Sequence, residues 1–158
     1  MGYQITLTPQ DMIKAATAAI YCQIHYYSEA RVKPRDPEML LMGWMAQQAV
    51  GRYHYQDYSY DVNDWIHTGK ADTSDGYEIR CSVKRNLWIG QSDKPHQRYW
   101  LVMPIQDNRF WLLGSVHRED VEHLAQPGMR PGSAVISYDD LLPHLRQVTR
   151  PMEKRIRA

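Results

Sequence analysis

Apolar and polar residues alternate strictly over one segment near the middle of the chain, between Tyr77 and Lys84. A period of two is typical of a strand that packs one face on a core and leaves the other to line a surface or a cleft. The preceding Asp75-Gly76 pair indicates a tight turn into this strand. The predicted core-facing set is Tyr77, Ile79, Cys81 and Val83, and the opposite set is Glu78, Arg80, Ser82 and Lys84.

Two helices are predicted before this strand. Thr8 is a suitable cap and Pro9 fits a first helical turn, so the first helix begins here and continues to about Ala30. The Asp36-Pro37-Glu38 segment begins a second helix by the same logic. Its apolar residues recur at helical spacing and predict a buried face. They are Leu40, Leu41, Trp44, Met45 and Ala49.

Two near-continuous apolar runs follow, at residues 99–105 and 110–116, joined by a Gln-Asp-Asn turn. Such runs are typical of neighbouring interior strands in a sheet that is covered on both faces. We expect the run 99–105 to lie beside the strand of Glu78, with both strands buried.

The rest of the chain predicts shorter elements. Arg118 opens a short helix that reaches Leu124, and Val135-Ile136 form a last short strand. A final helix covers residues 138–148, where Pro143 interrupts or starts it. We therefore expect one α/β (α+β) domain over residues 1–158. In it, a small mixed β-sheet contains the Glu78 strand, the two N-terminal helices cover one face, and the later helices cover the other.

Composition is that of a globular protein. The 158 residues are 43% apolar and 23% charged, which argues against disorder. The net charge is only +1, so nucleic-acid binding would need a local basic patch. The sequence shows neither a signal peptide nor an apolar run near the roughly 20 residues of a membrane span. We expect a cytoplasmic protein without a membrane partner, in which Cys22 and Cys81 are small buried apolar groups.

Three charged residues around the central strand suggest chemistry. Asp72 precedes the turn, Glu78 lies on the strand, and Arg80 follows on the same face. The turn brings the two acids back towards each other, where they can hold a divalent metal while the arginine faces an anionic substrate. The alternative is that both acids are ordinary solvated edge charges.

These residues resemble the core motif of the PD-(D/E)XK nuclease superfamily, in its small phage or mobile-element type. The resemblance rests on Asp72, on Glu78-Ile79-Arg80 after a short turn, and on the order of the flanking elements. It implies a restriction-endonuclease-like core at about residues 37–148, followed by a basic tail at 149–158. It also implies that Mg²⁺ or Mn²⁺ binds to Asp72, Glu78 and the backbone carbonyl of Ile79, and that DNA is cleaved.

Two positions depart from the family's pattern. Arg80 stands where the family has a lysine; an arginine stays protonated and cannot act as a base, but it can hold a phosphate. Gln47 stands on the second helix where the family often carries a glutamate. The alternative is therefore a non-catalytic descendant that binds DNA or protein, such as a phage accessory or inhibitory protein in the host cytoplasm.

Further residues are candidates for supporting roles. Lys84 and Arg85 would bind nucleic acid, together with the basic tail. Gln47 and Asp75 are accessory candidates for the metal site. A tyrosine-rich segment at residues 53–60 is either a stacking surface or, as we favour, a set of half-buried tyrosines. DNA is the expected partner, and a protein partner or a homodimer stays open.

Overall fold

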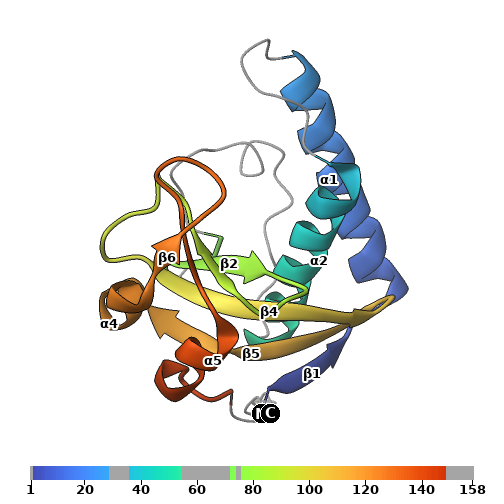
Figure 1. Ribbon diagram of the computed structural model, residues 1–158. Coiled ribbons are helices and arrows are strands. Elements are labelled where there is room, and N and C mark those ends of the chain that lie inside the picture. Colours follow the sequence, from blue (N-terminus) through green and yellow to red (C-terminus); the bar gives the residue numbers. More distant parts are fainter. Residues whose placement is uncertain (1, 29–35, 55–71, 74–75, 149–158) are drawn as a thin grey trace.

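A computed structural model describes residues 2–28, 36–54, 72–73 and 76–148 (Figure 1). The helices are α1 (Pro9–Ser28), α2 (Pro37–His54), α4 (Arg118–Val121) and α5 (Tyr138–Leu141), with 3₁₀ turns η1 (Glu122–Leu124) and η2 (Leu142–His144). The strands are β1 (Tyr3–Thr6), β2 (Tyr77–Cys81), β3 (Leu87–Ile89), β4 (Arg98–Gln106), β5 (Arg109–His117), β6 (Gln126–Pro127) and β7 (Ala134–Ile136).

The main sheet has the order β1-β5-β4-β2. It is mixed, because β2 runs parallel to β4 while the β4–β5 and β5–β1 pairs are antiparallel. The predicted pairing of the 99–105 run with the Glu78 strand is confirmed. The prediction that the Glu78 strand lies inside the sheet is wrong, since β2 is the edge strand of the described sheet and is only half-buried. Its five residues include Glu78 and Arg80, whose side chains suit an edge better than an interior.

Both long helices begin where the sequence predicted. At the start of α1, Thr8 and Asp11 form a reciprocal cap: the Asp11 N–H donates to Thr8 Oγ1 at 3.2 Å, and the Thr8 N–H donates to Asp11 Oδ2 at 2.9 Å. Arg52 of α2 then forms an ion pair with Asp11 at 3.2 Å, which joins the two helices. The described part of α1 ends at Ser28, so the predicted continuation to Ala30 lies outside the described residues.

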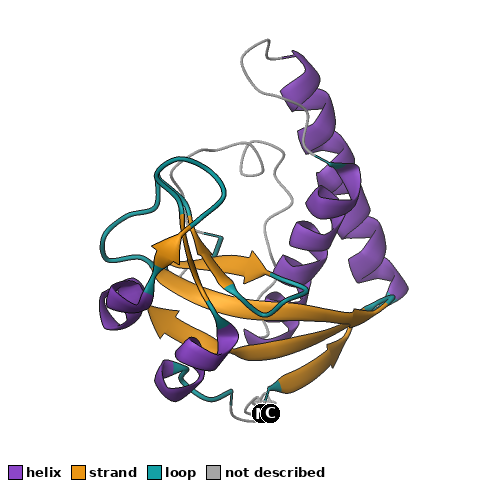
Figure 2. Cartoon of the chain, viewed as in Figure 1, coloured by secondary structure: helices purple, strands orange, loops and turns teal. Residues whose placement is uncertain are grey.

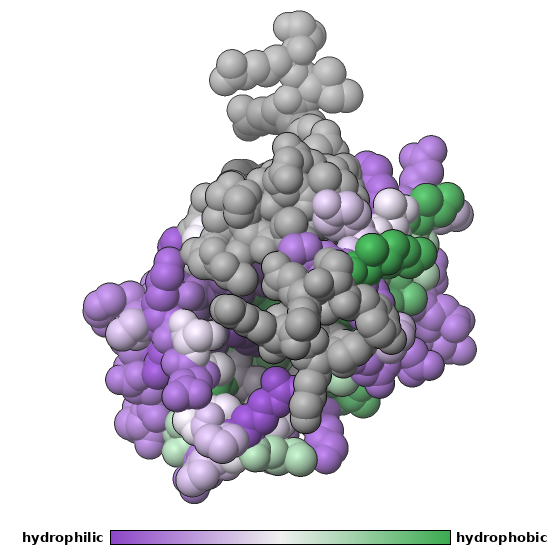
Figure 3. Space-filling model, turned by 90° about the horizontal axis from the view of Figure 1, so that it is seen from above, coloured by the Kyte–Doolittle hydropathy of each residue, from purple (hydrophilic) through white to green (hydrophobic). Residues whose placement is uncertain are grey.

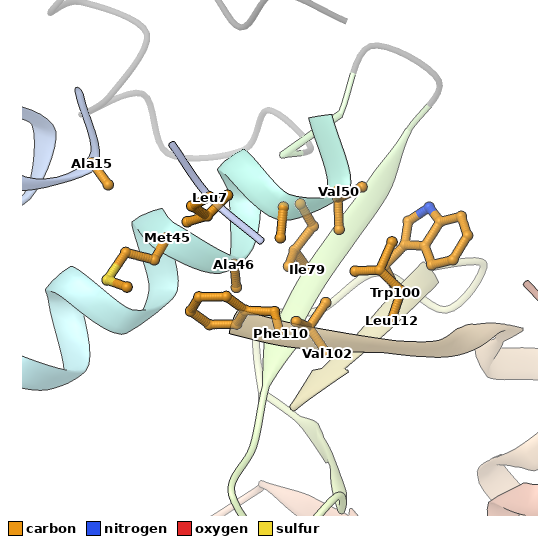
Figure 4. Close-up of a cluster of buried hydrophobic side chains, with 11 residues drawn as sticks. Leu7, Ala15, Met45, Ala46, Val50, Ile79, Trp100, Val102, Phe110 and Leu112 are labelled. Carbon is orange, nitrogen blue, oxygen red and sulfur yellow. The ribbon is translucent and has the colours of Figure 1, made fainter. Parts of the chain in front are cut away.

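One hydrophobic cluster lies between the main sheet and the long helices (Figure 4). Met45, Ala46 and Val50 of α2 contact strand residues from β2, β4 and β5. The alternation predicted for β2 is confirmed for three residues, because Ile79 is in this cluster and Tyr77 and Cys81 pack against it. Burial raises the pKa of the Cys81 thiol to about 12, as expected for a cysteine that acts as a small apolar group.

A second cluster lies on the opposite face of the sheet. Tyr99 and Leu101 of β4 point into it, towards α4, α5 and a small antiparallel sheet of order β3-β7-β6. Figure 2 shows the long helices on one side of the main strands and the short helices on the other, as predicted. The two central strands β4 and β5 are therefore covered on both faces.

Several elements differ from the prediction. β2 ends at Cys81, so Val83 and Lys84 lie in the following turn, and Val83 is 67% exposed and not in the core. The expected final helix at 138–148 is only the short α5 followed by η2, because Pro143 cannot donate the hydrogen bond that would extend the helix. Strands β1, β3 and β6 were not predicted.

In the view of Figure 3 the described surface is mainly hydrophilic, and the most hydrophobic residues lie mostly toward the right of the view. Exposed isoleucines at positions 13, 20 and 24 belong to α1. Within the described ranges, no helix combines the length and the apolar character that a membrane crossing requires.

Candidate metal-binding and phosphate-binding site

The outer edge of β2 holds Asp72 in place. Ser82, just past the strand, donates its N–H to Val102 of β4 at 2.9 Å. Because backbone groups of successive strand residues alternate in direction, Ile79 faces away from β4. Its N–H donates to Asp72 Oδ2 at 2.8 Å. The carbonyl of Ile79 points to the same open edge, where the resemblance expected a metal ligand.

The turn before β2 is built on Thr73. Its N–H donates to the carbonyl of Tyr77 at 3.0 Å, and its hydroxyl accepts from the Tyr77 N–H at 2.9 Å. Gly76 completes the turn with a φ of +88°, a left-handed conformation that favours glycine. This turn carries Asp72 back alongside the strand, which is the return that the Asp-Gly pair predicted. Asp75 itself lies outside the described residues.

Gln47 of α2 reaches the same acid. Its Nε2 donates to Asp72 Oδ1 at 3.2 Å, so both oxygens of Asp72 accept a hydrogen bond. The structure thus brings together the accessory residue and the acid that the resemblance placed side by side. Burial raises the pKa of Asp72 above its ordinary value, against the opposing effects of the Ile79 N–H and the Arg80 charge.

Glu78 is the second acid of the pair. Burial raises its pKa to about 7, and the neighbouring Asp72 charge and a hydrogen bond between the two carboxyls act in the same direction. Arg80 opposes this rise, with its Nη1 3.6 Å from Glu78 Oε2. Two close carboxyls of raised pKa compete for a proton, and a bound cation would relieve their repulsion.

Arg80 is held by several partners. Its Nη2 contacts both carboxylate oxygens of Asp93, at 2.7 and 2.9 Å, and its Nε donates to the backbone carbonyl of Trp88 at 3.2 Å. Its guanidinium also lies 5.5 Å from the centre of the Tyr99 ring. Burial alone would lower the pKa of Arg80, but the Asp93 charge raises it above its ordinary value. Arg80 is thus a permanent cation beside the acid pair.

Asp93 is the site residue that the sequence reasoning missed. Burial alone would raise its pKa, yet the Arg80 charge and its hydrogen bonds hold the pKa below the ordinary value. Its only sequence signal is an acid in a polar loop after Gly90, which describes many loop residues. The pairing with Arg80 arises only when the loop between β3 and β4 folds over the strand.

The residues predicted to contact nucleic acid follow β2 directly in the chain. Lys84 and Arg85 are exposed after the end of β2, so Lys84 does not lie on the strand face with Arg80 as the alternation had suggested. The Arg85 guanidinium stacks over the ring of Tyr138, 4.6 Å from its centre. The basic tail at 149–158 and the tyrosine-rich segment beyond His54 lie outside the described residues.

The donor set fits a magnesium-type ion only in part. Two carboxylates and one backbone carbonyl share the open edge of β2, and Mg²⁺ commonly uses one or two carboxylates and keeps several waters. Across the described ranges, however, no three His, Cys, Asp or Glu side chains group so as to hold a metal. Among the described residues, an ion here would therefore depend on Asp72, Glu78, the Ile79 carbonyl and water.

Comparison of the chain with protein-family models, with curated proteins and with solved structures found no match.

Proposed function

We propose that this chain is a metal-dependent nuclease, or a nuclease-like DNA-processing protein, that cleaves phosphodiester bonds. One observation carries the proposal: Asp72 and Glu78 meet at the open edge of β2, beside the cation Arg80. Neighbouring carboxyl groups with raised pKa values are characteristic of functional sites. The resemblance of this segment to the PD-(D/E)XK core supports the same conclusion.

Each residue then has a distinct role. Asp72, Glu78 and the Ile79 carbonyl would hold Mg²⁺ or Mn²⁺, which when bound activates water and neutralises developing charge. Arg80 cannot accept a proton, so it acts through its positive charge, placed next to the acids where the scissile phosphate would lie. Gln47 orients Asp72 through its amide.

A metal titration combined with a cleavage assay tests this function. Mg²⁺ or Mn²⁺ should raise the melting temperature of the wild type, because the unfolded chain has no such site. Glu78→Gln keeps the side-chain shape and should abolish both this shift and plasmid nicking. Glu119→Gln, at an exposed acid that pairs with His96 on the surface, is the matched control and should change neither. A wild type with neither a metal-dependent shift nor cleavage contradicts the nuclease proposal.

The second candidate is a non-catalytic module of the same fold that binds DNA or protein. It is favoured by the contacts of Arg80, since Asp93 and Trp88 already occupy three of its five N–H donors. Arg80→Lys separates the two candidates. In a working nuclease, lysine should retain or raise cleavage, because the resembling family uses it there. A binding module does not cleave DNA, and Arg80→Lys should not give it this activity.

A further inference from the structure

Asp93 is anchored more firmly than a surface acid requires. Its Oδ2 accepts hydrogen bonds from the Gly90 N–H at 3.0 Å and from the Tyr99 hydroxyl at 2.8 Å, in addition to the Arg80 contacts. Its backbone carbonyl accepts from Arg118 Nη1 at 2.8 Å. The carboxylate is only 12% exposed. These bonds come from β4, from α4 and from its own loop, so the position of Asp93 is determined by three separate parts of the fold.

This anchoring determines how Arg80 is presented. The guanidinium is planar and carries five N–H donors. Nε is bonded to Trp88 and Nη2 to Asp93, which leaves the Nη1 edge on the side of Glu78, 3.6 Å from its Oε2. A freely rotating arginine would offer a two-pronged contact to any phosphate. Here only one nitrogen of Arg80 faces the acid pair.

The geometry points to Asp93 as a positioning residue for the proposed nuclease site. It holds Arg80 so that Nη1 alone meets the substrate phosphate, much as the single ammonium of a lysine would, and it neutralises much of the arginine's long-range attraction for DNA. This inference rests on the proposed function. It predicts that loss of Asp93 harms the chemical step and leaves substrate binding equal or tighter.

The test uses Asp93→Asn, which keeps the shape of the side chain but removes its charge. In steady-state cleavage, kcat should fall by roughly 10- to 100-fold, the scale of a misplaced group in an active site, without a rise in KM. In metal-free buffer, the released arginine should tighten binding to a short DNA duplex by about two- to fivefold, the worth of one exposed ion pair. Glu119→Gln, which changes the net charge equally, should do neither.

A double-mutant cycle with Arg80→Ala shows whether Asp93 acts through Arg80. In the Arg80→Ala background, Asp93→Asn should have no further effect on kcat or on binding. Equal effects in both backgrounds would overturn the inference, and so would an Asp93→Asn protein that behaves like Glu119→Gln. Tyr99→Phe provides a milder second variant if Asp93→Asn fails to fold. It removes a single bond to Asp93 and should lower kcat in the same direction.

An inactive wild type and an Asp93 without influence on Arg80 would give different results. If the wild type shows neither a metal-dependent shift nor DNA cleavage, the nuclease proposal is wrong, and the metal-free binding cycle still decides the role of Asp93. Tighter binding in Asp93→Asn that disappears in the Arg80→Ala background supports Asp93 as the residue that restrains Arg80. Unchanged binding across the cycle rules that role out.

Discussion

The fold raises the pKa of Glu78 into a range that an unfolding experiment can test. Its side chain is 21% exposed, and its pKa rises from 4.5 to about 7 because it is buried beside Asp72. The folded protein therefore binds a proton that the unfolded chain releases in this pH range. As a result, the free energy of unfolding should fall as pH rises from about 4.5 to about 7, and level off above that range.

Glu78→Gln should remove this loss. Without metal and above pH 7, the variant should be more stable than the wild type by roughly 1–3 kcal/mol. This is less than the full equivalent of a rise in pKa from 4.5 to about 7, because the side chain keeps part of its contact with water. At a pH below 4.5 the two proteins should have similar stability. Urea unfolding across this range, in the presence of a chelator, measures the difference. A wild type whose stability does not change over this range would show that Glu78 titrates normally.

Among the secondary-structure elements, the edge of β2 and the start of α1 are each determined by hydrogen bonds from nearby side chains. Within the described part of the chain, the outer edge of β2 is bonded to Asp72 and Thr73 and to no further strand, so the acid of the site also protects the sheet edge. The start of α1 is held by the Thr8–Asp11 cap and by the ion pair from Asp11 to Arg52. Helix α1 is thereby linked to α2, the helix that supplies Gln47.

Thr8→Ala should destabilise the protein by about 1 kcal/mol, because it leaves an N–H of the first turn without its acceptor. Thr17→Ala is the matched control on the same helix. The hydroxyl of Thr17 bonds only to the carbonyl of Ile13 on an exposed turn, so alanine there should be neutral or slightly stabilising. Urea midpoints of both variants measure the contrast. Equal destabilisation by the two would mean that the cap contributes nothing beyond helix propensity.

At the scale of the whole molecule, the main sheet separates two hydrophobic clusters, and the candidate site lies at its β2 edge. The net charge of +1 offers little general attraction for DNA. Arg80 is largely neutralised by Asp93 and Glu78, whereas Lys84 and Arg85 are exposed in the adjacent turn. Any affinity for DNA should therefore come from few phosphate contacts.

DNA affinity should accordingly fall with salt, but with a shallow slope in a plot of log K against log salt concentration. Lys84→Gln should reduce that slope by about one, as expected for the loss of one phosphate contact. Lys14→Gln, on α1, is the control and should leave the slope unchanged. Fluorescence anisotropy with a labelled duplex gives both values. Binding that is absent at low salt, or insensitive to salt, would favour a protein partner over DNA.

The elements with local signals could be predicted from the amino-acid sequence. The caps of α1 and α2, the apolar runs of β4 and β5, and the alternation of Tyr77, Ile79 and Cys81 each depend on neighbouring residues, and the structure confirms them. β1 could also have been predicted, because Tyr3-Gln4-Ile5-Thr6 alternates between apolar and polar residues, and the burial of these residues alternates in the same way. The turn that returns Asp72 to the strand was predicted from the Asp-Gly pair.

The edge position of β2 and the surroundings of Arg80 depend on how the folded elements pack and could not be predicted from the sequence. The edge position depends on which strands pair, and the partner of Arg80 is an acid 13 residues away whose loop is anchored by Tyr99 and Arg118. Such contacts leave no repeating pattern in the sequence, because an ion pair involves only two residues, which meet once the chain has folded. For the same reason, burial and the resulting pKa of Glu78 are properties of the assembled fold and not of its sequence neighbours.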